Sequence, residues 1–214
     1  MVVGVNMKKV ISCVQDLRQD SIKELVERRK REFRALGRKS SEEMFKELCF
    51  CILTANYTAE GGIRIQKEIG DDFLRMSEKQ MAKRLRALRY RFPNVRANYI
   101  VEARKHANFL KDTLKGFSSS VDARLWLAKN VKGLGMKEAS HFLRNIGYTD
   151  VAIIDFHIVD FLVDYGVLER PKTITPKRYV EIEEKLKRIG DRAGMDMAEL
   201  DLYMWYCETG KVLK

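Results

Sequence analysis

The sequence predicts an all-α protein, on three observations. Apolar residues repeat with helical period in several windows, and alternating strand-like segments are nearly absent. Proline occurs only three times in 214 residues, so helices can run with few interruptions. A chain of this length suits one large domain or two small ones.

Four windows carry an apolar stripe along one helix face. In each, apolar side chains recur three or four residues apart, as in a helix that buries one side. The stripes are Phe45, Leu48, Cys49 and Ile52; Ile100, Ala103, Ala107 and Leu110; Ala139, Phe142, Leu143 and Ile146; and Tyr179, Ile182, Leu186 and Ile189.

Residues that start and stop helices stand between these stripes. Ser40 or Ser41 offers an N-cap, and Thr175 caps a helix that begins at Pro176. Gly147 and Gly166 stand where helices should end. We expect a terminal lobe, residues 1–58 with 150–214, and a central lobe, residues 59–149.

The charge balance favours a polyanionic partner. The formal net charge is +11, and excess Lys and Arg supply non-specific affinity for nucleic acid. A solvated, charge-rich surface is the alternative. No apolar run approaches the ~18 residues of a membrane helix, and the N-terminus shows no signal peptide, so we expect a cytoplasmic protein with no membrane partner.

The cysteines and histidines give no sign of a metal site. Cys13, Cys49, Cys51 and Cys207 fit neither a disulfide framework nor a zinc site, so we expect buried free thiols. The histidines, at 106, 141 and 157, make no ligand pattern. Catalysis through a protein-bound metal is therefore not expected.

The segment "VKGLGMK" (131–137) joins two predicted short helices, 122–131 and 136–146. We expect Gly133 and Gly135 to adopt the left-handed conformations that so short a connection requires. Glycines also leave backbone N–H groups accessible at the second helix's N-terminus, where the helix dipole favours a phosphate. The segment 122–147 thus predicts a helix–hairpin–helix that grips a DNA backbone; an ordinary αα-turn is the alternative.

Lys137 lies in the first turn of the helix that follows the hairpin. A cation is electrostatically disfavoured there, which would free its amine as a nucleophile. Contact with a phosphate, or simple solvation, is the alternative.

Asp155 directly follows the apolar run Val151–Ile154 and precedes a helix whose buried positions would be 158, 159 and 162. An aspartate at such a junction is an N-cap by default. It could also face a cleft, held rigid by its own helix.

Together these features resemble the helix–hairpin–helix superfamily of DNA base-excision glycosylases. That superfamily has a Gly-x-Gly hairpin, a catalytic lysine two residues later and an essential Asp about eighteen residues further on, which "GLGMK…IID" matches. The stretch "CFCILTANYTAEGGIRIQKEIG" is similar to its segment that meets DNA near the lesion. The resemblance implies a two-lobed fold with the active site in the cleft between lobes, with Lys137 and Asp155 as catalytic residues.

Two departures narrow the resemblance to the type-2 8-oxoguanine DNA glycosylase/AP lyases of archaea and some bacteria. The C-terminal four-cysteine loop of iron–sulfur members is missing, and so is an N-terminal β-domain. "RYRFPNVRANYIVEAR" and the terminal Lys214 fit the type-2 family. The resemblance implies no cofactor and no iron–sulfur cluster, and leaves open a monovalent cation on the hairpin.

The resemblance also implies roles for further residues. Trp205 would stack on the flipped base, although a core position on an amphipathic helix is its alternative. Lys214 would reach that base with its terminal carboxylate. Gly133, Gly135, Asn56 and Tyr57 would contact DNA. The partner would be double-stranded DNA containing a damaged base, bound by a monomer.

Other readings of the sequence remain open. A different lesion could be the substrate, as for enzymes similar to endonuclease III or to 3-methyladenine glycosylases. The chain could instead be a helix–hairpin–helix DNA-binding module that uses Lys137 only for phosphate.

Overall fold

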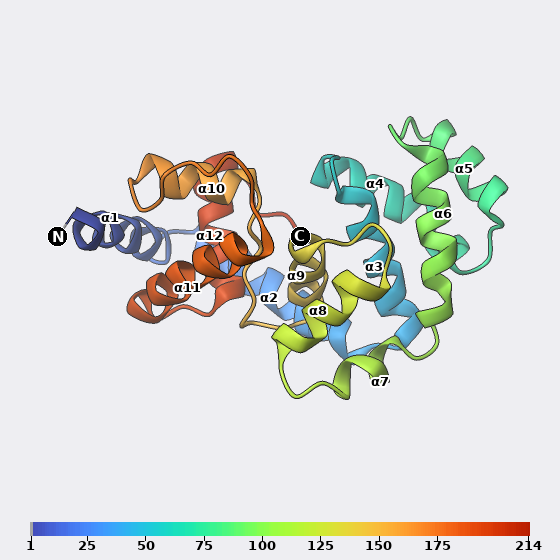
Figure 1. Ribbon diagram of the computed structural model, residues 1–214, viewed down its shortest axis with the longest axis horizontal. Helices are drawn as coiled ribbons and strands as arrows, with labels where there is room; N and C mark the ends of the chain where they lie inside the picture. The colour runs from blue at the N-terminus through green and yellow to red at the C-terminus, as the bar shows by residue number, and fades with distance from the viewer. Residues whose placement is uncertain (1) are drawn as a thin grey trace. The chain divides into compact units, whose positions relative to one another are not determined.

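The computed structural model describes residues 2–214 and divides into two compact units. Unit 1 comprises the described residues up to Phe33 together with Gly147–Lys214, and unit 2 comprises Arg34–Ile146. All the regular elements of the described chain are helices, with no β-strand among them, as the sequence predicts (Figure 1). The first boundary differs from the expected one, because residues 34–58 belong to unit 2.

Unit 1 contains four helices and most of a fifth, and unit 2 contains the rest. The elements are α1 (Val2–Leu17), α2 (Ile22–Arg38), α3 (Ser41–Thr54), α4 (Ala59–Ile69), η1 (Gly70–Leu74), α5 (Glu78–Ala87), α6 (Pro93–Ala103), η2 (Arg104–His106), α7 (Leu110–Lys115), α8 (Ser120–Asn130), α9 (Met136–Asn145), α10 (Phe156–Asp164), α11 (Pro176–Ala193) and α12 (Met197–Thr209).

The predicted helix caps are confirmed. The hydroxyls of Ser40 and Thr175 each accept a hydrogen bond from the backbone N–H three residues on, at 3.3 and 3.2 Å. Pro176 is the first residue of α11, where its fixed φ suits a helix start. The chain turns left-handed at Gly147 and Gly166, with φ of +98° and +67°, shortly after α9 and α10.

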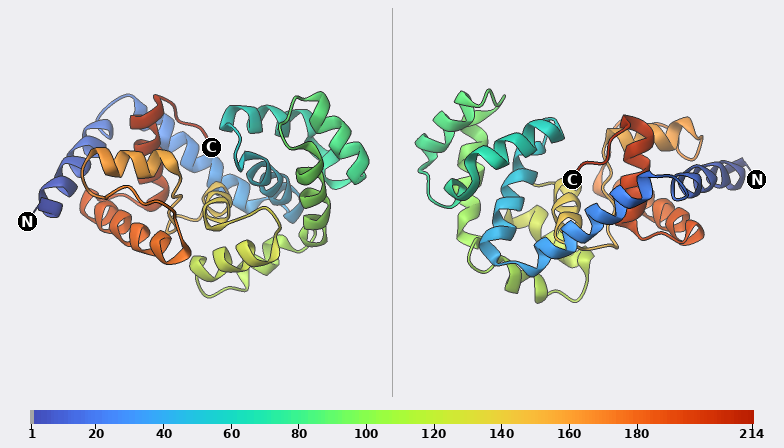
Figure 2. Two further views of the ribbon diagram at one scale, coloured as in Figure 1. Left: turned by 45° about the horizontal axis from the view of Figure 1, so that its top comes forward. Right: turned by 180° about the vertical axis from the view of Figure 1, so that it is seen from behind.

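Helix α3 is the centre of unit 2 and explains the shifted boundary. It packs against α4, α6, α7 and α9, and almost every residue after its first turn is buried. Glu47 of α3 accepts hydrogen bonds from Asn145 of α9 at 2.7 Å and from Gln66 of α4 at 2.9 Å. These contacts hold α3 in unit 2. Helices α5 and α6 lie side by side at one edge of the same unit (Figure 2).

Unit 1 is built from α1, α10, α11 and α12, which pack on one another. A buried ion-pair cluster ties α2 to the start of α12. Lys30 of α2 lies 2.8 Å from Glu199 and 3.0 Å from Asp196, and Arg18 lies 3.0 Å from Glu199. Breaking such a cluster would leave a buried charge unpaired, so it fixes the orientation of α12.

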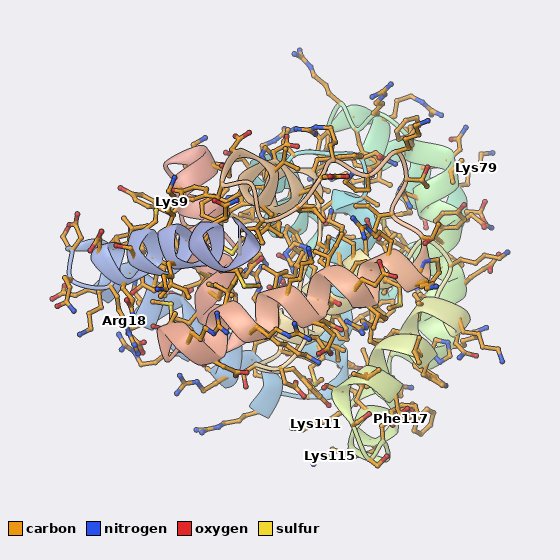
Figure 3. All side chains as sticks on the ribbon, turned by 60° about the vertical axis from the view of Figure 1, so that its left-hand side comes forward. Lys9, Arg18, Lys79, Lys111, Lys115 and Phe117 are labelled. Atoms are coloured by element: carbon orange, nitrogen blue, oxygen red, sulfur yellow. The ribbon has the colours of Figure 1, made fainter. Side chains whose placement is uncertain are left out.

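Several of the lysine and arginine side chains that give the chain its positive charge point outward. Some of them are hydrogen-bonded within the protein and are therefore not available to bind a partner. Figure 3 places Lys111, Lys115 and Phe117 together at one end of unit 2. Lys111 Nζ donates to the carbonyls of Arg38 and Lys39, both at 2.7 Å. Lys111 therefore caps the C-terminal end of α2, where a cation is favoured.

The cysteines depart from expectation. Cys49 and Cys51 are buried in α3, as predicted, but Cys13 is half-exposed and Cys207 is exposed. Cys13 and Cys207 lie on helices of unit 1, and the sequence pattern did not indicate that these two side chains would be accessible to solvent. None of the described helices combines the length and apolar character needed to cross a membrane.

Candidate active site and nucleic-acid interface

The predicted helix–hairpin–helix is present in unit 2 as α8, a short turn and α9. The turn is closed by a 3.2 Å hydrogen bond from Leu134 N–H to the carbonyl of Val131. Gly133 has φ of +87°, and a Cβ there would lie 2.5 Å from the Tyr99 ring and 2.9 Å from the Arg96 guanidinium. Both conformation and space therefore require glycine at this position.

Gly135 behaves differently from the prediction. Its φ of −96° and ψ of −168° are extended backbone, which any residue adopts, so the expected left-handed conformation is wrong here. The Gly135 N–H donates to the carboxylate of Glu138 at 3.1 Å. Glu138 was not singled out from the sequence, although an acid three residues after an N-cap is a known capping signal.

Lys137 is the second residue of α9 and is 28% exposed. Its Nζ lies 3.7 Å from the other carboxylate oxygen of Glu138. The helix dipole disfavours a cation at this end of a helix, and Glu138 offsets part of that effect. The amine thus stands beside a turn suited to phosphate, with a carboxylate next to it.

Asp155 is the N-cap of α10 in unit 1, as predicted. Its carboxylate accepts a 3.0 Å hydrogen bond from Ile158 N–H. The preceding apolar run, 151–154, is buried and belongs to no helix or strand. Since the carboxylate has two oxygens, one bond to the helix leaves further acceptor capacity.

Side chains of α11 hold the segment that leads to Asp155. The carboxylate of Glu183 accepts from Ala152 N–H at 2.8 Å. The Tyr179 hydroxyl accepts from Ile154 N–H at 3.2 Å and donates to the Ala152 carbonyl at 2.7 Å. Buried backbone N–H and C=O groups need hydrogen-bond partners. Side chains of α11 provide for this extended segment the hydrogen bonds that a neighbouring β-strand would provide in a sheet.

Exposed Asn56 and half-buried Tyr57 form the turn after α3. Asn56 has a left-handed φ of +61°, which asparagine tolerates better than most residues. The Tyr57 ring meets the Tyr90 ring edge-on, with 4.7 Å between centroids. The sequence could not show this second ring, which comes from the α5–α6 connection.

The α5–α6 connection, residues 88–92, is a second loop beside the first, and sequence reasoning did not assign it a function. Tyr90 donates its hydroxyl to the Leu53 carbonyl at 2.7 Å, which joins this loop to the last turn of α3. Arg89 is exposed with φ of +59°, and the exposed Phe92 ring has the Arg91 guanidinium 4.9 Å from its centroid. The alternation of basic and aromatic residues in "RYRF" (89–92) could have indicated a nucleic-acid-binding loop.

Arg96 of α6 connects these features within unit 2. Only 8% exposed, it donates from Nη2 to the Ala55 carbonyl at 3.0 Å, while its Nη1 faces Gly133. One side chain thus contacts both the turn that carries Asn56 and the hairpin. Arg96 holds two of the predicted DNA-binding segments in a fixed relation.

Trp205 and Lys214 lie in unit 1, on α12 and on the tail that follows it. Trp205 is half-buried, and its indole Nε1 finds no hydrogen-bond partner among the described residues. The His157 ring meets Trp205 edge-on at 4.6 Å. His157, two residues after Asp155, is a neighbour that sequence reasoning missed. Val212 is 5% exposed, which anchors the tail that ends at Lys214.

Metal ligands do not gather in the part of the chain that the structure describes. Within residues 2–214 there is no group of three or more His, Cys, Asp or Glu side chains that could hold a metal ion. The cofactor prediction, with its open question of a hairpin cation, stays a prediction.

The fold and these residues define a class of protein. A helical chain with a helix–hairpin–helix, a lysine in the first turn after it and an aspartate capping a later helix is the architecture of a helix–hairpin–helix DNA glycosylase.

Comparison with known proteins gives the family. Residues 26–195 match the family model described as 8-oxoguanine DNA glycosylase, so the chain belongs to that family. A protein of Korarchaeum cryptofilum named 8-oxoguanine DNA glycosylase/AP lyase is 51% identical over 96% of this chain and 98% of its own length.

Solved structures agree. The Methanocaldococcus jannaschii 8-oxoguanine glycosylase/lyase, in complex with a 15mer DNA containing 8-oxoguanine, is 50% identical with a TM-score of 0.93, covering 96% of this chain and 100% of that one. The 8-oxoguanine DNA glycosylase of Thermotoga maritima is 43% identical with a TM-score of 0.90, covering 97% and 100%. The predicted family and fold class are confirmed.

Proposed function

We propose that this chain excises 8-oxoguanine from double-stranded DNA and then cleaves the abasic strand through a Schiff base on Lys137. Family membership and relatives named 8-oxoguanine DNA glycosylase/AP lyase support the activity. The observation that carries the mechanism is Lys137 itself, a half-buried amine in the first turn after the Gly133 hairpin.

Unit 2 would hold the DNA. The hairpin offers a phosphate the N-terminal end of α9, and Lys and Arg side chains add sequence-independent affinity. The target nucleotide must leave the stack before its glycosidic carbon can be reached. Asn56, Tyr57 and the neighbouring Phe92 would fill the space that the extruded base vacates. The protein would bind DNA as a monomer and act in the cytoplasm.

The chemistry would use Lys137 and Asp155. Asp155 would deprotonate or orient Lys137 and stabilise positive charge on the sugar as the bond to the base breaks. The amine would attack C1′ and form the Schiff base. Elimination of the 3′ phosphate from that intermediate would cut the strand. An ordinary lysine is protonated at neutral pH, so the site must supply this activation.

Base recognition would fall to α12 and the C-terminal tail. The Trp205 ring would stack on the flipped base, with His157 fixing its orientation. An acceptor near Lys214 would take a hydrogen bond from the N7 hydrogen that 8-oxoguanine has and guanine lacks. An acceptor placed for that hydrogen gives the discrimination the reaction needs.

Single-turnover excision on matched duplexes tests this function. The duplexes would carry 8-oxoguanine, thymine glycol, 3-methyladenine or unmodified guanine at one position. We expect release and strand cleavage with 8-oxoguanine, and rates at least about 10²-fold lower with the other three. Faster cleavage at thymine glycol or 3-methyladenine would contradict the proposed substrate while leaving the lyase mechanism standing.

A further inference from the structure

Two cysteines from opposite ends of the chain face each other in unit 1. Cys13 lies on α1 and Cys207 on α12, 194 residues apart in sequence, and their Sγ atoms are 3.5 Å apart. Both are thiols in this structure. A disulfide requires a sulfur–sulfur separation of about 2.05 Å, so a movement of about 1.5 Å would join them.

The pair differs from the other two cysteines in its access to solvent. Cys49 and Cys51 are fully buried in α3, where they behave as small apolar residues. Cys207 is exposed and Cys13 half-exposed, so a small oxidant can reach them. Neither belongs to the groups assigned to DNA binding or catalysis.

The surroundings of the two thiols predict a disulfide that forms slowly and is reduced slowly. Although Cys207 is exposed as a residue, its thiol packs against Cys13 and is partly desolvated. This desolvation, and then the hydrogen bond with Cys13, raise the pKa of Cys207 to about 12. A hydrogen bond with Cys13 likewise raises the pKa of Tyr165. Little Cys207 thiolate forms at neutral pH, and a thiol with a high pKa is a poor leaving group. A bond between these sulfurs would form slowly and be slow to break.

We propose that Cys13 and Cys207 are a disulfide site that ties α1 to α12. The oxidant is a low-molecular-weight disulfide. The Cys207 thiolate attacks one of its sulfurs, releases one small thiol and forms a mixed disulfide. The Cys13 thiolate then attacks Cys207 Sγ and releases the second small thiol. The protein loses two electrons and two protons, and the small disulfide is reduced to two thiols.

This bond would close nearly the whole chain into one loop. Long loops gain the most from closure, because the cross-link removes more freedom from the unfolded chain. It would also fix the N-terminal helix to α12, the helix that carries Trp205. The consequence is a more stable unit 1, without a new contact to DNA.

Oxidation of the full chain by glutathione disulfide, at about pH 9 to supply thiolate, tests the proposal. The expected product is a monomer about 2 Da lighter, with a Cys13–Cys207 cross-linked peptide and the two buried thiols of α3 still titratable after unfolding. Its thermal midpoint should rise by roughly 5–15 °C and return on reduction.

Three variants make the result decisive. Cys13→Ser and Cys207→Ser should each lose the mass change and the thermal shift, while Cys51→Ala should keep both. Circular dichroism of the reduced variants verifies that each is folded. Four free thiols after prolonged oxidation, a glutathione adduct that stays on Cys207, or a cross-link between two molecules would each overturn the proposal.

Discussion

Lys137 and Asp155 both stand at the N-terminal end of a helix, yet the two positions differ in what holds them. Asp155 is favoured there, since its charge suits the helix dipole and its carboxylate caps α10. Lys137 has the opposite charge, and the Glu138 carboxylate lies 3.7 Å from its amine. A residue that suits its place can be structural alone, whereas one that the helix dipole disfavours needs another reason to be there.

The supports of the two residues differ as well. Lys137 depends on a turn that one left-handed glycine makes possible. Asp155 depends on an extended segment whose backbone is bonded by side chains of α11. The lysine site is therefore sensitive to backbone changes and the aspartate site to side-chain changes, which the following substitutions separate.

The largest effect is expected from Asp155→Asn. Asparagine caps a helix about as well as aspartate, so the thermal midpoint should stay within a few degrees. It cannot take a proton from Lys137, so excision of 8-oxoguanine should fall by roughly 10²–10⁴-fold. Single-turnover rates, with binding to an uncleaved duplex as the control, measure this. Unchanged turnover would leave Asp155 only its capping role.

Gly133→Ala should have the next largest effect. A left-handed φ disfavours alanine by about 1–2 kcal/mol, and its Cβ would press on Tyr99 and Arg96. We expect affinity for duplex DNA to fall by about tenfold or more, equal to about 1.4 kcal/mol. Gly135→Ala is the matched control: its extended backbone should accept alanine with little loss. Equal losses in both variants would refute the distinction between the two glycines.

Tyr179→Phe tests the support of Asp155 without touching it. The change removes one hydroxyl and leaves Ile154 N–H and the Ala152 carbonyl without that partner. Unfolding free energy should drop by about 1–3 kcal/mol. Excision should slow while DNA affinity, which we propose to depend on unit 2, stays constant. A variant that loses affinity but keeps its excision rate would show that the two supports are not separate.

Glu138→Gln should have the smallest effect. Its carboxylate accepts from the Gly135 N–H and lies beside Lys137, so it would compete with a DNA phosphate bound at the start of α9. Removing the charge should tighten DNA binding by about twofold to fivefold, as expected of a partly exposed charge near a helix end. Titrations at two salt concentrations measure this. Weaker binding would mean that Glu138 shapes the hairpin rather than competing for it.

The sequence predicted the features that depend on neighbours along the chain. The N-caps at Ser40, Thr175 and Asp155 and the left-handed Gly133 follow from local backbone chemistry. The left-handed conformation predicted for Gly135 was wrong, because this residue is extended and its N–H donates to the Glu138 carboxylate. Local patterns can mark a glycine turn without stating which glycine needs the special φ.

Features that depend on tertiary packing were not predictable. The observed domain boundary differs from the predicted one because α3 packs against helices that are distant in sequence. Tyr90 beside Tyr57, His157 beside Trp205 and Arg96 between two segments all pair residues distant in sequence. The same holds for Cys13 and Cys207. Periodicity shows that a residue is on a helix face but not what that face meets.

Borohydride trapping on 8-oxoguanine duplex tests the central claim most directly, since reduction converts a Schiff base into a stable amine. We predict a covalent protein–DNA adduct, mapped to Lys137, that disappears in Lys137→Gln and persists in Lys115→Gln, an exposed lysine of α7. Binding of Lys137→Gln to uncleaved DNA verifies that it is folded. An adduct that survives in Lys137→Gln, or none in a wild-type chain that cleaves the strand, would contradict the account.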